Sequence, residues 1–154
     1  MHRRRQFGYT LTELVIVLTM IGIMAAVALP RMTAALGEAD AAWHDDLVGA
    51  LRHAQRLAVA KRRLVCVTVT STSISLTSDG KYQARTCLQT ELGPDGKATY
   101  ASTTSGDSNW AGMLYCQPDG RITSDVNGST AVSVQLAVKG APTIQVYGET
   151  GYVE

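Results

Sequence analysis

An uncharged apolar run near the N-terminus constrains this chain more than any other feature. Residues 14–30 form an unbroken stretch of seventeen residues without a charge, between Glu13 and Arg31. As a helix the stretch would measure about 26 Å at 1.5 Å per residue, close to the roughly 30 Å hydrocarbon core of a bilayer. Three arginines at positions 3–5 precede it, and basic residues stay on the cytoplasmic side. The sequence therefore predicts a membrane-spanning helix with a cytoplasmic N-terminus and the later residues on the far side.

The charge composition excludes two broad classes of protein. The 154 residues are 45% hydrophobic and 18% charged, with a formal net charge of +1. A disordered chain would combine low hydrophobicity with high net charge, and a protein that holds nucleic acid by bulk charge would have a large basic excess. Without residues 1–8 the chain holds eleven basic and thirteen acidic residues, so the remainder is slightly acidic.

The residues around Glu13 form a processing signature. A short basic leader ends at Gly8, and residues 8–14 read Gly-Tyr-Thr-Leu-Thr-Glu-Leu before the apolar run. This pattern resembles the type IV prepilin signature. The resemblance implies that a prepilin peptidase on the cytoplasmic face of the bacterial inner membrane cuts between Gly8 and Tyr9, and that Tyr9 is then N-methylated. It also makes Glu13 the glutamate at the fifth mature position, and Pro30 the proline that kinks the helix near its membrane exit.

The carboxylate of Glu13 has a physical role that fits this interpretation. A carboxylate among apolar residues needs a compensating cation, and cleavage after Gly8 creates one, the α-ammonium group of Tyr9. In a helical stack of subunits, Glu13 of one chain can meet the terminus of a neighbour. In a subunit that is not assembled, the carboxylate would instead reach toward the membrane interface.

An ordinary secretory signal peptide is the alternative interpretation of the N-terminus. Residues 26–28 read Ala-Val-Ala, which matches the small-residue cleavage site of such peptides. Cleavage there would release a secreted β domain that begins at Leu29. Against this stand the charge of Glu13 at the start of the apolar region and an apolar pattern that continues past the proposed cut.

Apolar residues recur at helical spacing after the run ends. Steps of three and four describe one amphipathic stripe, and Pro30 would bend a helix without necessarily ending it. The period changes to two near Arg63. The chain therefore divides into a leader at 1–8, a membrane and assembly helix at 9–30, an amphipathic helix at 31–63 and a β domain at 64–154. The stripe consists of Met32, Leu36, Ala39, Trp43, Leu47, Leu51, Ala54, Leu57 and Ala58.

Alternating, β-branched segments predict strands after the helix. The clearest cover residues 64–70, 73–77, 130–138 and 143–147, and weaker ones cover 82–88 and 112–116. Asp-Gly pairs at 79–80, 95–96 and 119–120 indicate turns, and the polar residues 90–109 indicate a loop. The expected fold class is α+β, with a long helix that leads into, and packs on, an antiparallel β domain.

Four segments of this layout resemble the GspH/FimT group of minor pilins and pseudopilins. They are residues 51–67, in which an Arg- and Ala-rich helix end leads into Val-Cys-Val, together with 110–112 (Trp-Ala-Gly), 119–121 (Asp-Gly-Arg) and 148–153 (Gly-Glu-Thr-Gly-Tyr-Val). The resemblance implies the pilin fold, with two antiparallel sheets arranged as a β-sandwich against the helix. It further implies a minor pilin of a type IV pilus or a pseudopilin of a type II secretion system. The partners would be other pilin or pseudopilin subunits, the prepilin peptidase and the inner-membrane assembly platform, with the C-terminal domain in the periplasm and then in the filament.

Three cysteines lie in the part expected outside the cytoplasm, where disulfides form. Cys66, Cys87 and Cys116 allow three single pairings and leave one thiol over. The sequence favours a structural disulfide over three free thiols, and it leaves the choice among the three pairings open.

The main basic cluster lies where the helix ends. It consists of Arg52, Arg56, Lys61, Arg62 and Arg63. Contact with DNA phosphates is one interpretation, because some members of the resembled family bind DNA for natural transformation through arginines in a Gly-Arg-x-Arg stretch at the C-terminus. Residues 148–154 are acidic here and contain no arginine. The sequence therefore favours a cluster that complements the negative end of the helix dipole.

Catalysis and cofactor binding are not expected from this sequence. No nucleophile elbow, phosphate-binding loop or paired carboxylate site is present, and no histidine follows His53 to activate a thiol in the β domain. His44, Asp45 and Asp46 point in different directions on a helix, which favours a solvated face over a metal site. The expected function is therefore structural.

Overall fold

The computed structural model describes residues 10–104 and 108–154, and for residues 27–38 it describes the backbone alone. The chain divides into two compact units, Met1–Gly37 and Glu38–Glu154. One helix, α1, covers Leu11–Lys61 and enters both. Pro30 lies within α1, so this proline does not end the helix, as its position predicts.

In the first unit, α1 begins with a capping arrangement. The backbone N–H of Glu13 donates to Oγ1 of Thr10 at 3.3 Å, which satisfies one of the free donors at the start of a helix. Thr10 and Glu13 have the spacing of a capping box. The described side chains of residues 11–26 are exposed. No helical segment within the described residues is both long and apolar enough to cross a membrane.

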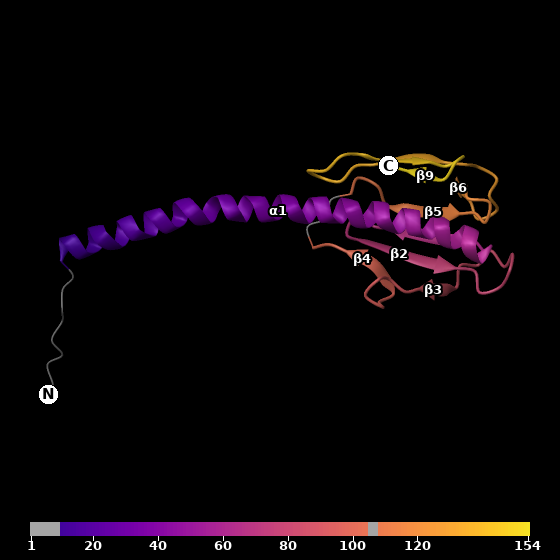
Figure 1. The fold of residues 1–154 in the computed structure, drawn as a ribbon, viewed down its shortest axis with the longest axis horizontal. Coiled ribbons are helices and arrows are strands. Elements are labelled where there is room, and N and C mark those ends of the chain that lie inside the picture. The colour runs from indigo at the N-terminus through magenta and orange to yellow at the C-terminus, as the bar shows by residue number, and fades with distance from the viewer. Residues whose placement is uncertain (1–9, 105–107) are drawn as a thin grey trace, which may run out of the picture. The chain divides into compact units, whose positions relative to one another are not determined.

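The second unit places the C-terminal part of α1 along antiparallel sheets (Figure 1). Within the described residues, one sheet has six strands in the order β3-β2-β1-β5-β6, with β4 also paired to β2, and the other has the order β7-β8-β9. This arrangement agrees with the expected α+β class, whereas the β-sandwich arrangement stays a prediction. The strands are β1 Val65–Val69, β2 Ser73–Ser78, β3 Gln89–Glu91, β4 Thr99–Ser102, β5 Gly112–Cys116, β6 Ile122–Thr123, β7 Ser133–Leu136, β8 Ile144–Tyr147 and β9 Tyr152–Val153.

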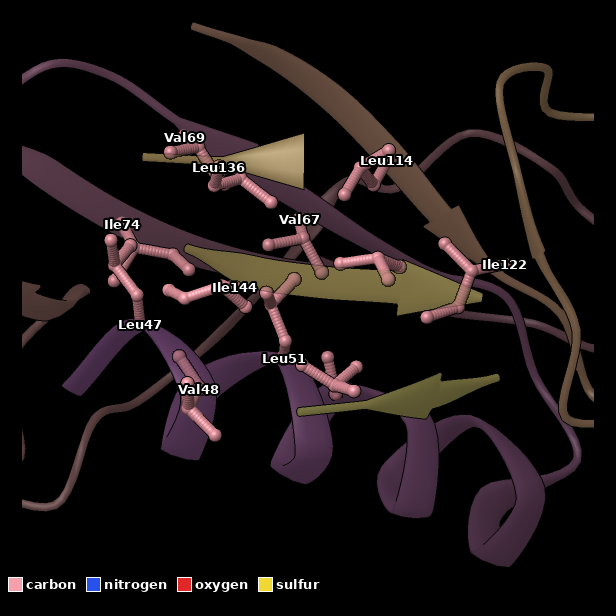
Figure 2. Packing of buried hydrophobic residues seen from close by; sticks show 14 of the residues in the cluster. Leu47, Val48, Leu51, Val67, Val69, Ile74, Leu114, Ile122, Leu136 and Ile144 are labelled. Carbon is pink, nitrogen blue, oxygen red and sulfur yellow. The ribbon is translucent and has the colours of Figure 1, made fainter. Parts of the chain in front are cut away.

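A single hydrophobic core joins the helix to the two sheets. Leu47 and Leu51 are directed from α1 toward strand side chains such as Ile144 (Figure 2). The buried helical residues are Trp43, Leu47, Val48, Ala50, Leu51, Ala54 and Ala58. Full burial of one leucine side chain stabilises a fold by about 1.5–3 kcal/mol. This part of the predicted stripe therefore explains why α1 packs on the sheets, although Ala39 is exposed and the buried stripe begins at Trp43.

The register of β1 decides which of its side chains enter that core. Val65 is paired with Cys116 and Val67 with Leu114, and paired residues of antiparallel strands share a face. Cys66 lies between the two valines, so its side chain points to the other face. Cys116 therefore lies on the core face of this sheet, and Cys66 lies on the opposite face.

Several predicted boundaries are wrong. Residues 82–88 form no strand, and the residues between 90 and 109 include strand β4, which pairs with β2. The strand expected at 130–138 is limited to Ser133–Leu136. Helix α1 ends at Lys61 because Arg62 has a φ of 49°, which a right-handed helix does not accommodate.

Backbone contacts link β6 to the chain around the C-terminal turn. The N–H of Ile122 donates to the Gly148 carbonyl at 2.8 Å, and the N–H of Val132 donates to the Ile122 carbonyl at 3.1 Å. A Cβ atom on Gly148 would collide with the Val132 backbone, and one on Gly151, at φ 68°, would collide with the Gly120 carbonyl. The glycines of the 148–153 segment therefore serve close backbone packing.

Candidate functional site

The processing residues lie at the edge of what the structure describes. Gly8 and Tyr9 fall outside the described residues, and the side chain of Pro30 does as well. Glu13 is described: it lies exposed in the first turn of α1. A carboxylate in that position also stabilises the positive end of the helix dipole by about 0.3–1 kcal/mol. The capping of α1 by Thr10 was missed, although the Thr10-x-x-Glu13 spacing is a signal for it.

The helical surface that follows Glu13 is apolar on all sides. Consecutive residues 14–18 are all large or β-branched and all exposed, and five consecutive positions on a helix cover its whole circumference. A helix that is hydrophobic all round is normally buried in a core or in a bilayer. The exposed large apolar residues of this segment are Leu14, Val15, Ile16, Val17, Leu18, Met20, Ile21, Ile23 and Met24. The segment therefore presents an apolar surface that the described part of the chain does not cover.

Two of the three cysteines are joined. Cys66 and Cys87 form a disulfide with a Cα–Cα separation of 6.0 Å, within the usual range. Cys116 is a buried free thiol on the core face of the sheet, opposite to the face of Cys66. Burial raises the pKa of Cys116 to about 12, so this thiol is almost entirely protonated at neutral pH and unreactive.

Two arginines near the C-terminal end of α1 contact the protein's own backbone. Nε and Nη2 of Arg52 donate to the Val153 carbonyl at 3.1 and 2.9 Å, and Nε of Arg56 donates to the Arg52 carbonyl at 3.2 Å. Both arginines line an open groove of about 320 Å³ beside Gly151 and Tyr152. Arg52 therefore ties the helix to the C-terminal strand β9, and DNA binding by this pair stays a prediction.

The basic residues at the end of α1 have separate partners. Nζ of Lys61 donates to Oε1 of Glu91 at 2.6 Å, and Nη1 of Arg63 donates to the Gly80 carbonyl at 3.1 Å. The guanidinium of Arg62 forms no hydrogen bond or ion pair with the part of the chain that the structure describes. The cluster expected at the helix end is thus spread over contacts with β3, with the 79–80 turn and with solvent.

The polar residues 44–46 of α1 lie at the helix surface. Nδ1 of His44 lies 3.1 Å from Oδ1 of Asp45. Burial, and then the charge of Asp45, raises the pKa of Asp46 above its ordinary value. Within the described residues, no group of three or more His, Cys, Asp or Glu side chains is placed to hold a metal ion.

A loop around Asp79 was missed at the sequence level. The Asp79 carboxylate is buried and accepts the backbone N–H groups of Arg85, Thr86 and Cys87 at 2.7, 2.7 and 3.0 Å. Arg85 and Cys87 have φ values of 51° and 49°, which turn successive N–H groups toward one anion. The Asp79-Gly80 pair predicted a turn, and it gave no signal that the carboxylate would organise residues six to eight positions later.

Comparison with known proteins supports the processing signature. Residues 3–29 match the family model described as the prokaryotic N-terminal methylation motif. The chain has a type IV prepilin-like N-terminus. No curated protein and no solved structure was found to match the chain. The motif supports a type IV pilin-like protein whose N-terminus suits peptidase processing, methylation and assembly with other pilin subunits, whereas membership of the GspH/FimT group stays a prediction.

Proposed function

We propose that this type IV pilin-like chain is a non-enzymatic minor pilin or pseudopilin of the GspH/FimT kind. Before assembly it resides in the bacterial inner membrane as a single-pass protein with its N-terminus in the cytoplasm. Prepilin peptidase removes residues 1–8 and methylates Tyr9, and the assembly platform then draws the subunit into a type IV pilus or a type II secretion pseudopilus. The match of residues 3–29 to the methylation motif carries this proposal.

The distribution of apolar surface supports an assembly role. In the second unit, buried helical residues such as Leu47 and Leu51 pack on the sheets and complete a core. In the first unit, residues such as Ile16 and Met24 are exposed. Large exposed apolar surfaces mark sites of membrane or protein interaction. The first stretch of α1 therefore suits contact with lipid and, later, with the corresponding helices of neighbouring subunits.

The charge of Glu13 supplies the specificity of this contact. A carboxylate inside an apolar helical stack is costly unless a cation pairs with it. The α-ammonium of a neighbour's processed Tyr9 is such a cation, so Glu13 favours neighbours that have been cut and aligned. This role adds to the effect of Glu13 on the start of α1, and an experiment must separate the two.

Two substitutions of Glu13 make that separation. Glu13→Leu removes both the charge and the polar group at this capping position, whereas Glu13→Gln removes the charge and keeps a residue that capping boxes accept. We expect both variants to be processed and both to be lost from purified filaments, measured by immunoblotting of the filament and membrane fractions. Filaments that contain Glu13→Gln at the native level would refute the charge pairing and leave only a role at the start of α1 for residue 13.

A further inference from the structure

A small cavity rich in arginine lies where α1 ends. Its volume is about 110 Å³, and it lies between the end of the helix, the Asp79 loop and the segment that follows β5. Arg62, Arg63 and Arg85 contribute to its wall. The remaining lining residues are Leu64, Asp79, Tyr82, Gln83, Gln117 and Pro118. The lining residues include three arginines and one aspartate, which gives a formal excess of two positive charges.

The Asp79 carboxylate in the cavity wall already accepts hydrogen bonds from the backbone. Asp79 is 1% exposed, and its two oxygens accept the three backbone N–H groups from Arg85 to Cys87. In the described structure, no hydrogen bond or ion pair joins this carboxylate to the side chain of Arg62, Arg63 or Arg85; Nη1 of Arg63 donates instead to the backbone carbonyl of Asp79 at 3.4 Å. The positive charge of the arginines therefore has no strong internal partner at this cavity.

The arginines are held in place while most of their donors stay free. Nη1 of Arg85 donates to Oδ1 of Asn127 at 2.6 Å, and Nη1 of Arg63 donates to the Gly80 carbonyl at 3.1 Å. Both acceptors are uncharged, and each guanidinium carries five N–H donors. These bonds orient the two groups and neutralise neither.

The wall of the cavity is built before any ligand arrives. The Cys66–Cys87 disulfide fixes the far end of the Asp79 loop to β1. Arg62, Gln83 and Arg85 line the cavity with φ values of 49°, 58° and 51°, a conformation that is uncommon for residues other than glycine. Such backbone conformations persist only when the surroundings enforce them, and they gather at ligand clamps.

We propose that this cavity binds a phosphate group, as inorganic phosphate or as a phosphate monoester. A phosphate monoester carries a charge of about −1.5 to −2 at pH 7, which matches the excess of two positive charges in the wall. The planar guanidinium fork of arginine pairs with two phosphate oxygens at once. The cavity exceeds the roughly 15 Å³ that a single water needs, and it is smaller than the roughly 300–1,000 Å³ of sites for drug-sized ligands. A single tetrahedral oxyanion fits between these limits.

Titration of the full chain in a non-ionic detergent tests the proposal. Amide NMR shifts would be followed as sodium phosphate replaces sodium chloride at constant ionic strength. We expect saturable shifts confined to residues 62–64, 79–87 and the segment around Gln117. Parallel titrations with glycerol 1-phosphate and acetate identify the ligand: saturation by glycerol 1-phosphate indicates that a monoester is accepted, and its absence restricts the site to inorganic phosphate. Acetate binding as tight as that of phosphate would overturn the phosphate assignment.

Glutamine variants locate the site. Arg62→Gln removes a guanidinium without intrachain partners in the described structure, so its fold should be unaffected, and we expect at least fivefold weaker phosphate binding. Arg85→Gln should weaken binding to a similar extent. Arg56→Gln, in the groove beside Tyr152, is the matched control and should bind as the native chain does. Native affinity in an Arg62→Gln/Arg85→Gln double variant, or an equal loss in Arg56→Gln, would overturn the proposal.

Discussion

At the scale of single residues, side-chain direction decides what the cysteines can do. Val65 and Cys116 share the core face of the first sheet, and Cys66 points from the other face toward Cys87. Cys66 is one residue after Val65 in β1, and this single step places its side chain on the opposite face from Cys116. Cys116 is therefore a buried free thiol, whereas Cys66 forms a disulfide with a loop residue. The spacing of the three cysteines contains no such information, so the sequence left the pairing open.

Thiol titration of the native chain checks this assignment. We expect no reaction of the folded protein with a thiol reagent at pH 7, because Cys116 is buried and its pKa is raised to about 12. Unfolding without reductant should expose one thiol, and reduction should expose three. A thiol that reacts in the native state would contradict the assignment. So would any number of reactive thiols other than one after unfolding without reductant.

The carboxylate of Glu91 couples stability to acid pH. Burial alone would raise the pKa of Glu91, but hydrogen bonds from Lys61 and Ser78, with the charge of Lys61, outweigh it and lower the pKa below 4.5. A lowered pKa in the folded state contributes stability above the ordinary value, and this contribution is lost as the pH falls through the folded value.

We therefore expect Glu91→Gln to lower the free energy of unfolding at pH 7 by about 1 kcal/mol or less. The difference from the native chain should shrink as the pH falls below 4.5. Urea unfolding at pH 7 and pH 3 measures it, with exposed Glu149→Gln as the control, for which a change within about 0.5 kcal/mol is expected. A deficit of Glu91→Gln that grows at pH 3 would show that the sign is wrong.

At the scale of elements, the helix and strands with the strongest sequence patterns are the ones that were predicted most accurately. Most of the α1 stripe from Trp43 to Ala58 is buried. Strands β1, β5 and β8 lie within predicted segments, and β2 extends one residue beyond its predicted segment. These elements bury alternating or periodic apolar residues, which is the property that sequence patterns record. Strands β6 and β9 have two residues each, too few to show a period.

The element that was predicted wrongly is the 82–88 segment. Its conformation follows from the Asp79 carboxylate, which binds N–H groups six to eight residues later, and from the Cys66–Cys87 bond, which spans 21 residues. Local alternation cannot report such contacts. The arginine cavity depends on the same loop, so the sequence indicated the helix-end arginines but not Arg85.

Gly148→Ala tests the backbone junction beside the C-terminal turn. A methyl group there would collide with the Val132 backbone, so we expect a loss of about 3 kcal/mol or more in the free energy of unfolding. Gly49→Ala is the matched control, because open space surrounds Gly49 within α1 and alanine favours a helix by about 0.5–1 kcal/mol. Chemical denaturation compares the two, and equal stabilities would refute the close contact.

At the scale of the whole molecule, the chain combines an exposed apolar helix with a folded β domain. Residues Glu38–Glu154 form a compact unit whose core includes the helical residues Trp43 to Ala58. A chain that starts at Thr33 holds ten basic and twelve acidic residues, and it keeps this core. The residues that complete this core are therefore separate in the sequence from the exposed apolar segment before them.

We expect the chain from Thr33 to be a folded monomer that binds duplex DNA no better than the non-specific range of about 10⁻⁴–10⁻⁶ M at physiological salt. The Arg52 guanidinium is engaged with Val153, which reduces what the basic cluster offers to phosphates. Light scattering and fluorescence anisotropy at two salt concentrations measure both properties. Tight, salt-sensitive binding that disappears in Arg52→Ala/Arg56→Ala would favour a DNA-uptake pilin instead.

Mass spectrometry of the mature N-terminus is the decisive measurement for processing by a prepilin peptidase. The chain would be purified from the membranes of a bacterium that contains a prepilin peptidase. We expect a mature protein that begins at Tyr9 and carries one added methyl group, and a Gly8→Ala variant that keeps its leader. A native chain that begins at Leu29, or one that keeps residues 1–8, would refute the proposed processing.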